Sequence, residues 1–283
     1  MTTAQDRIDS ATKKDPKQLL VAQLERPQLL DFIRSVAPDM DPLGVVRVAF
    51  AHVQATPALR ECSVPSIVQA VAEAAKLGLT VDGLLGHAYL VPFREGGGKA
   101  AKMMIGYRGI EQLAYRSGLV TRFHADTVHE NDHFEYAEGV VVVFSHRRPR
   151  LGEDRGEMIG AYATAHLKAG PPLISVMDME EIHARRARSA SFKAKPAASP
   201  WTTDFEAMAK KTPIRELGKR IPYPTLQSAS LRDEARDEGR ATVEDPIDLG
   251  DADVHDECAE CGRLDLINGK CPDCDPIEPE VPQ

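Results

Sequence analysis

The first part of the chain carries apolar residues at helical spacing. One helix is predicted after Asp41, an N-cap candidate that proline follows at the first helical position. Its apolar face would hold Leu43, Val46, Phe50 and Val53. The same spacing recurs up to Gly78, a residue that can end a helix in the left-handed conformation, at Ile67, Ala70, Val71, Ala74 and Leu77. Both segments are predicted to be core-facing helices.

From residue 87 onward the apolar pattern is typical of strands. HAYLVPF and AKMMIGY flank the loop REGGGK, whose glycines can supply the turn of a hairpin. After a helix that ends at Gly118, a period of two returns in residues 120–129, where Arg122, His124 and Asp126 share a face. It recurs around VVVVFSH and MIGAYATAHL. The predicted fold class is α+β, a small antiparallel sheet with packed helices.

Capping patterns mark two helices further along the chain. Asp178 and Glu181 have the spacing of a capping box, and so do Thr203 and Glu206. The basic stretch HARRARSASFKAKP between them contains helix breakers, so it is predicted to be a mobile loop. Beyond about residue 228 acidic residues dominate and large apolar residues become rare, which indicates a disordered linker.

Charge is unevenly distributed along the chain. The 283 residues carry a net charge of −8, but residues 231–283 hold 5 Lys/Arg against 17 Asp/Glu, so the preceding body is mildly basic. The sequence lacks the 18 or more continuous apolar residues of a membrane span, and MTTAQDRIDSATKKD lacks the apolar core of a signal peptide. We therefore expect a cytoplasmic protein that makes no membrane contact.

Two basic segments are candidates for binding DNA. Ten Lys/Arg and three Asp/Glu lie between Arg185 and Arg220, and the basic residues at helical spacing are Lys210, Lys211, Arg215 and Lys219. The second segment interleaves basic and aromatic residues, namely Lys102, Tyr107, Arg108, Tyr115 and Arg116. Cationic groups neutralise phosphates and aromatic rings stack on bases. A solvated helix face and ordinary core tyrosines are the alternatives.

Three segments resemble signature segments of the RecT family, namely LGLTVDGLLGHAYLVPF, IGYRGIEQLAYRSG and PWTTDFEAMAKKTPIRELGKRIP. PALRECSVPSIVQAVAEAAKLGL resembles the family's helix just upstream, so the resemblance covers about residues 57–224. It implies a phage or prophage protein that binds single-stranded DNA and anneals it without ATP, with a core like that of other single-strand annealing proteins.

The resemblance also implies partners and a setting in the bacterial cytoplasm. The partners are single-stranded DNA, the annealing duplex, further copies of the chain in a ring or filament, a phage exonuclease and a host single-strand-binding protein. A magnesium requirement for annealing is left open.

Carried to this chain, the resemblance assigns DNA contacts to Lys102, Tyr107, Arg108, Arg116, Lys210, Lys211 and Arg215. His87 matches a signature too, with packing as its alternative role. Two residues depart from the family pattern. Pro213 replaces a helix-compatible residue, at a cost of about 3 kcal/mol or more inside a helix, unless Thr212 caps a restarted helix. Glu216 replaces what is often a second arginine.

Four cysteines near the C-terminus form two CxxC pairs, Cys258 with Cys261 and, nine residues later, Cys271 with Cys274. Two such pairs supply the four thiolates of a tetrahedral structural zinc. The module is expected to fold only with the metal, and unpaired reduced thiols are the alternative. Its acidic flanks would repel phosphate, which favours protein docking. Cys62 is expected to be a small buried residue.

The predicted organisation is a flexible N-terminus (1–16), a RecT-like DNA-binding and annealing domain (17–228), an acidic linker (229–256), a four-cysteine zinc module (257–276) and a flexible tail (277–283). GGGKAAK lacks the spacing and the Ser/Thr of a phosphate-binding loop, so a non-enzymatic protein is predicted. Two alternatives stay open, a metal-dependent nuclease using HADTVHENDHFE and a zinc-bearing adaptor whose body binds protein.

Overall fold

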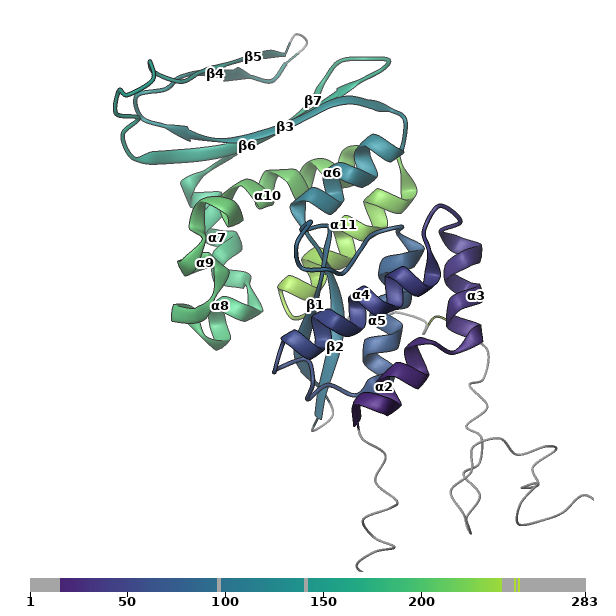
Figure 1. The fold of residues 1–283 in the computed structure, drawn as a ribbon. Helices are drawn as coiled ribbons and strands as arrows, with labels where there is room; N and C mark the ends of the chain where they lie inside the picture. The colour runs from purple at the N-terminus through teal and green to yellow at the C-terminus, as the bar shows by residue number, and fades with distance from the viewer. Residues whose placement is uncertain (1–15, 96–97, 140–141, 241–246, 248, 250–283) are drawn as a thin grey trace, which may run out of the picture. The chain divides into compact units, whose positions relative to one another are not determined.

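The computed structural model describes residues 16–95, 98–139, 142–240, 247 and 249 (Figure 1). The chain divides into two compact units. The first contains residues 1–78, 92–102 and 245–283, and the second contains residues 79–91 and 103–244. The predicted zinc ligands Cys258, Cys261, Cys271 and Cys274 lie outside the described residues.

The first unit is built from helices α2 (Pro16–Leu24), α3 (Pro27–Val36), α4 (Pro42–Ala55) and α5 (Val64–Lys76). Both predicted helices are confirmed, and the Asp41 carboxylate caps α4 by accepting from the Gly44 amide at 2.8 Å. Gly78 follows α5 with φ of 61°. Leu43 is 40% exposed, because the buried stripe of α4 runs through Val45, Val46, Ala49 and Val53. Cys62 is buried, as expected.

The predicted hairpin is confirmed as β1 (Ala88–Glu95) and β2 (Gly98–Ile105). Its outer part, residues 92–102, belongs to the first unit. There it is tied to the start of α5, because the Ser63 amide donates to the Lys99 carbonyl at 2.9 Å. The Ala101 amide donates to the Ser66 hydroxyl at 2.8 Å.

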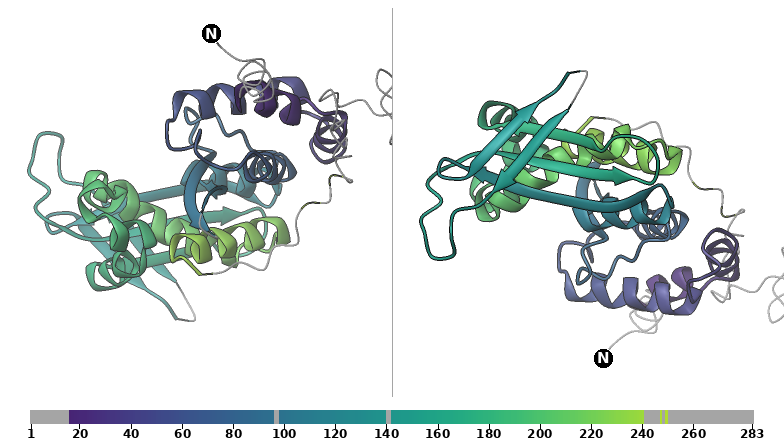
Figure 2. Two further views of the ribbon diagram at one scale, coloured as in Figure 1. Left: turned by 90° about the horizontal axis from the view of Figure 1, so that it is seen from below. Right: turned by 90° about the horizontal axis from the view of Figure 1, so that it is seen from above.

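The second unit contains an antiparallel sheet in the order β3 (Val120–His129), β6 (Met158–Leu167), β7 (Leu173–Asp178). Helix α10 (Phe205–Arg220) packs along one face of this sheet together with α6 (Tyr107–Arg116), and α11 (Pro224–Asp237) packs against these two helices. The hairpin of β4 (His133–Ala137) and β5 (Val143–Arg147) lies on the other face (Figures 1 and 2). The α+β fold class is thus confirmed.

Side-chain size on β6 explains this layering. Ala161, Ala163 and Ala165 are buried, and small side chains let a helix approach the strand closely. Tyr162 points to the opposite face, where its ring meets Phe144 of β5 at a centroid distance of 4.9 Å. The alternation of small and aromatic residues thus separates the helical face of the sheet from the hairpin face.

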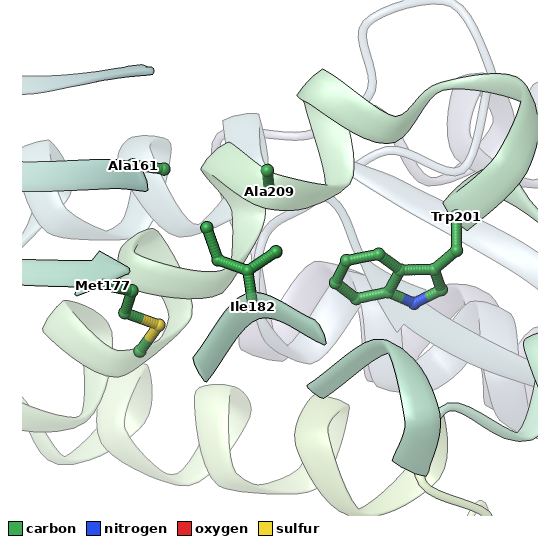
Figure 3. Packing of buried hydrophobic residues seen from close by; sticks show 5 residues of the cluster. All are labelled: Ala161, Met177, Ile182, Trp201 and Ala209. Atoms are coloured by element: carbon green, nitrogen blue, oxygen red, sulfur yellow. The ribbon is translucent and has the colours of Figure 1, made fainter. Parts of the chain in front are cut away.

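A short helical segment follows the sheet, with α7 (Met179–Arg188), α8 (Ala190–Ala194), the 3₁₀ turn η1 (Pro196–Ala198) and α9 (Pro200–Thr203). Its core is the buried cluster of Ala161, Met177, Ile182, Trp201 and Ala209 (Figure 3). The capping box of Asp178 and Glu181 is confirmed at the start of α7. The box predicted at Thr203 is wrong, because that residue ends α9 and Asp204 precedes α10.

Three further differences arise from tertiary contacts. The loop predicted after residue 183 is largely helical, and the Arg186 guanidinium lies 4.3 Å from the centroid of the Phe192 ring. Pro213 lies inside α10 and is buried there, so the helix does not restart at Thr212. The linker predicted from residue 229 is wrong for residues 229–237, which belong to α11.

Among the described residues, no helix has the length and apolar character needed to span a membrane.

Candidate nucleic-acid interface

The first two family-like segments meet in the second unit, where residues 79–87 cross the start of α6. The Gly106 amide donates to the His87 carbonyl at 2.9 Å. A Cβ atom on Gly106 would lie 2.0 Å from the Gly86 carbonyl oxygen, and one on Gly109 would lie 2.1 Å from that of His87. Only glycine fits this approach of two backbones. The backbone carbonyl of His87 thus takes part in this packing, and the role of its side chain stays a prediction.

Asp82 fixes the conformation of the crossing loop. Its carboxylate accepts from the amides of Leu84 and Leu85, both at 2.8 Å, and from the Thr80 hydroxyl at 3.2 Å. Burial acts to raise the pKa of Asp82, but the two amides and the hydroxyl outweigh it, and the pKa is lowered. The loop is therefore held in a single turn while Leu84 is 83% and Leu85 46% exposed.

Tyr107 and Arg108 begin α6 directly beside this loop. The Arg108 Nε donates to the Tyr107 hydroxyl at 3.1 Å, and a terminal nitrogen donates to the Leu85 carbonyl at 3.5 Å. The hydrogen bond that Arg108 donates to Tyr107 raises the pKa of Arg108, so the exposed guanidinium stays charged. Among the described residues, its hydrogen-bond partners are this hydroxyl and this carbonyl. It forms no salt bridge with a carboxylate there, and Glu111 on the same helix acts on it only electrostatically.

We call the surface formed by Leu84, Leu85, Tyr89, Tyr107 and Arg108 the loop patch. A Cβ atom on Gly86 would lie 3.0 Å from the Tyr89 hydroxyl and 3.5 Å from the Arg108 Cδ, so this glycine lies between the two side chains. Tyr89 is 39% exposed. The loop patch combines apolar, aromatic and cationic groups, which are the groups that contact single-stranded nucleic acid.

Two other predicted contact residues lie at exposed or half-buried positions. Arg116 is exposed in the last turn of α6. Lys102 lies on β2 with its Nζ 5.9 Å from the centroid of the Phe93 ring. Lys102 belongs to the first unit, whereas the other six predicted contact residues belong to the second.

The basic residues of α10 have a different environment. Lys211 pairs with Asp233 of α11 at 3.2 Å, and Arg215 pairs with the same carboxylate at 2.9 Å and with Asp237 at 3.2 Å. The side chains of Lys211 and Arg215 are only 15% and 9% exposed. Burial acts to lower the pKa of Arg215, but the carboxylates outweigh it and the pKa is raised. Lys210 pairs with Glu206 at 3.2 Å.

The same network extends to Glu216, the second departure from the family pattern. Lys219 donates to Glu216 at 2.9 Å and to Glu234 of α11 at 2.8 Å. Arg185 of α7 also pairs with both glutamates. The basic cluster predicted to track phosphates thus joins α7, α10 and α11 through ion pairs, and phosphates would compete with these carboxylates for it.

The acidic run considered for a nuclease forms a second polar network, at the hairpin β4–β5. Asp126 pairs with Arg148 at 2.6 Å. Asp132 pairs with Arg155 at 2.6 Å, and the His146 Nε2 lies 2.9 Å from the same carboxylate. Burial acts to raise the pKa of Asp132, but Arg155 and His146 outweigh it and hold this pKa well below its usual range. Within the described part of the chain, no group of three or more His, Cys, Asp or Glu is arranged to hold a metal ion.

Comparison with known proteins places the chain in the class of single-strand annealing recombination proteins. The RecT family model matches residues 44–246, and the chain belongs to the RecT family. It is 33% identical to Protein RecT of Escherichia coli (strain K12) over 238 residues, which cover 82% of this chain and 85% of that protein. It is 28% identical over 155 residues to the uncharacterized protein YqaK of Bacillus subtilis (strain 168), covering 53% of this chain and 49% of YqaK.

Family membership confirms the resemblance found in the sequence and supports single-stranded DNA binding and oligomerisation. What the sequence-based assignment missed is the pair of exposed leucines in the loop patch. The available signal was the string DGLLG, in which two large apolar residues stand between turn-forming residues and outside any helical or strand period.

Proposed function

We propose that this protein binds single-stranded DNA and anneals complementary strands without ATP, as a ring or filament on the DNA, in phage-type recombination. The single observation that supports this most directly is Arg108, an exposed guanidinium that lies beside Tyr107 and forms no salt bridge among the described residues, with Glu111 acting on it only electrostatically. The glycines and the turn at Asp82 fix the backbone around Arg108, so its guanidinium is positioned before DNA binds.

Most of the proposed contacts are made to the DNA backbone, not to the groups that distinguish one base from another. Lys102, Arg108, Arg116 and Lys210 are the cationic groups that we assign to phosphates, and Tyr107 is assigned to stacking. Phosphate contacts leave the pairing edges of the bases free to test a second strand. The free energy of annealing then comes from base pairing, and the protein supplies alignment and charge neutralisation.

Lys211 and Arg215 receive a different role in this proposal. Because Asp233 and Asp237 occupy their cationic groups, a phosphate could reach them only by displacing α11 carboxylates. We assign both residues to stabilising the packing of α10 on α11.

The test is annealing of labelled complementary oligonucleotides by the purified chain in buffer without ATP. Annealing faster than the spontaneous rate, with rings or filaments visible on single-stranded DNA, supports the proposal. An unchanged rate refutes it. Magnesium-dependent shortening of the label would favour a nuclease instead, and binding of neither strand would favour a protein-binding adaptor.

A substitution tests the site itself. Arg108→Ala is expected to weaken binding to all oligonucleotide sequences and to lower the slope of log affinity against log salt by about 0.7, the value for one phosphate contact on a single strand. The matched control is Arg34→Ala, which removes the same charge from an arginine paired with Asp31 on α3. An equal effect of both substitutions would show that only net charge matters.

A further inference from the structure

We propose that Leu84 and Leu85 contact the unpaired bases of single-stranded DNA, so that the loop patch is the base-contacting element of the site. The proposal rests on the proposed function, and it adds a surface that binds base faces beside the groups that bind phosphates.

The first argument is that the loop holds both leucines in solvent. The Asp82 carboxylate binds the amide of each leucine, and Gly106 allows a backbone approach that would leave only 2.0 Å between a Cβ and the Gly86 carbonyl oxygen. The loop therefore cannot turn the leucines inward without breaking these contacts. An apolar pair fixed in water gains free energy when an apolar surface covers it.

The second argument concerns the chemistry of the ligand that would cover the two leucines. The Arg108 guanidinium lies within hydrogen-bond distance of the Leu85 carbonyl and forms no salt bridge among the described residues. The ring of Tyr107 lies with its centroid 5.8 Å from the same guanidinium. An occupant that presents an anionic group and a flat apolar face side by side fits this arrangement. A nucleotide has a phosphate and a base face within one repeating unit.

Contact between a leucine side chain and a base face indicates that the bound bases are unpaired. In a duplex the base faces are covered by neighbouring pairs, so contact with a leucine side chain requires an unpaired or partly unstacked base. Contact with a base face leaves its pairing edge open. The loop patch would thus favour single strands over duplex while permitting annealing, and it would do so without sequence preference.

The experiment compares two ligands, an oligonucleotide of mixed sequence and an abasic oligonucleotide of equal length and charge. The proteins are the full native chain, Leu84→Ser/Leu85→Ser, and a control, Leu151→Ser, which changes a leucine that is fully exposed in another turn. We expect the double variant to lose about 10-fold in affinity for the normal oligonucleotide, the order expected for lost apolar contacts, and to change little on the abasic one. The control should match the native chain on both.

Further outcomes test the proposal independently of folding. Leu84→Met/Leu85→Met keeps apolar side chains in the same turn and should retain the native preference for normal over abasic DNA. An equal loss on both ligands would overturn the base contact. A lower mass of the DNA-free double variant in light scattering, with an unchanged preference, would instead identify a contact between copies of the chain. If the native chain binds neither ligand, the proposed function itself fails.

Discussion

Replacing Arg215 by methionine is expected to destabilise the second unit by about 3 kcal/mol, although the new side chain is apolar and similar in length. The reason is Asp233, whose side chain is only 1% exposed and which pairs with Arg215 at 2.9 Å. Removing one partner of a buried ion pair costs about 3 to 5 kcal/mol, because the other charge stays buried without compensation. The lower end applies here, since Lys211 still lies 3.2 Å from the carboxylate.

The double variant Arg215→Met/Asp233→Leu is the internal comparison. It removes both buried charges, and exchanging a buried pair for apolar residues is often close to neutral, so we expect a cost of about 1 kcal/mol. Its former neighbours Lys211 and Asp237 have side chains 15% and 14% exposed and can turn toward solvent. Urea and thermal unfolding followed by circular dichroism measure both effects. For a domain of this size the single variant should melt about 6 to 12 °C below the native chain.

Two results would refute this reasoning. If the single variant loses less than about 1 kcal/mol, or if the double variant is no more stable than the single, the pair is not the stabilising unit that the geometry indicates. DNA binding is measured on the same proteins below their melting temperatures. The double variant should bind single-stranded DNA within about twofold of the native chain. A tenfold loss in a folded double variant would return Arg215 to the DNA site.

Four other features allow tests of the same kind. Because the pKa of Asp132 is depressed in the folded chain, its contribution to stability is present above the unfolded value of about 3.9 and is lost progressively as the pH falls toward the folded value. The melting temperature should therefore drop as the pH is lowered below about 4, and less steeply in Asp132→Asn. Gly106→Ala places a Cβ 2.0 Å from the Gly86 carbonyl oxygen. This substitution should lower the free energy of unfolding by about 3 kcal/mol or more and weaken DNA binding. An unchanged melting curve would contradict the close approach of the two backbones. Metal analysis should find about one zinc per chain, absent after Cys258→Ser/Cys261→Ser, and an unchanged zinc content would exclude these ligands. Deleting residues 241–283, which leaves α11 complete, should preserve annealing; a loss of annealing would place a necessary element in the tail.

Local patterns predicted those parts of the fold that local interactions stabilise. The Asp41 cap, the Gly78 terminus, the hairpin around REGGGK and the capping box at Asp178 all appear where the sequence places them. Each depends on residues within a few positions of one another. The information needed to predict these elements is therefore present in a short window of sequence.

Helix α11 shows why other parts could not be predicted. Its buried residues after position 229 are all polar, namely Ser230, Asp233, Glu234 and Arg236. Composition predicts that such residues are exposed to solvent. In the structure, Asp233 and Glu234 pair with basic groups of α10 and α7 that are distant in sequence, and Arg236 donates to the Met103 carbonyl of β2. For the same reason the basic residues of α10 resemble a phosphate-binding face in the sequence, while Lys211 and Arg215 face carboxylates in the structure.

The site residues follow the same division. Tyr107 and Arg108 could be proposed as DNA contacts from the sequence because they stand in a family-like segment. The exposure of Leu84, in contrast, depends on a backbone approach between segments about 20 residues apart. That approach has a consequence for annealing. If DNA binds at the loop patch as we propose, a loop fixed by Asp82 and by glycine contacts loses little conformational entropy on binding, so weak contacts to phosphates and base faces are sufficient. Weak contacts also allow the protein to release the strand once base pairing makes the duplex more stable than the bound single strand. An annealing protein requires such release.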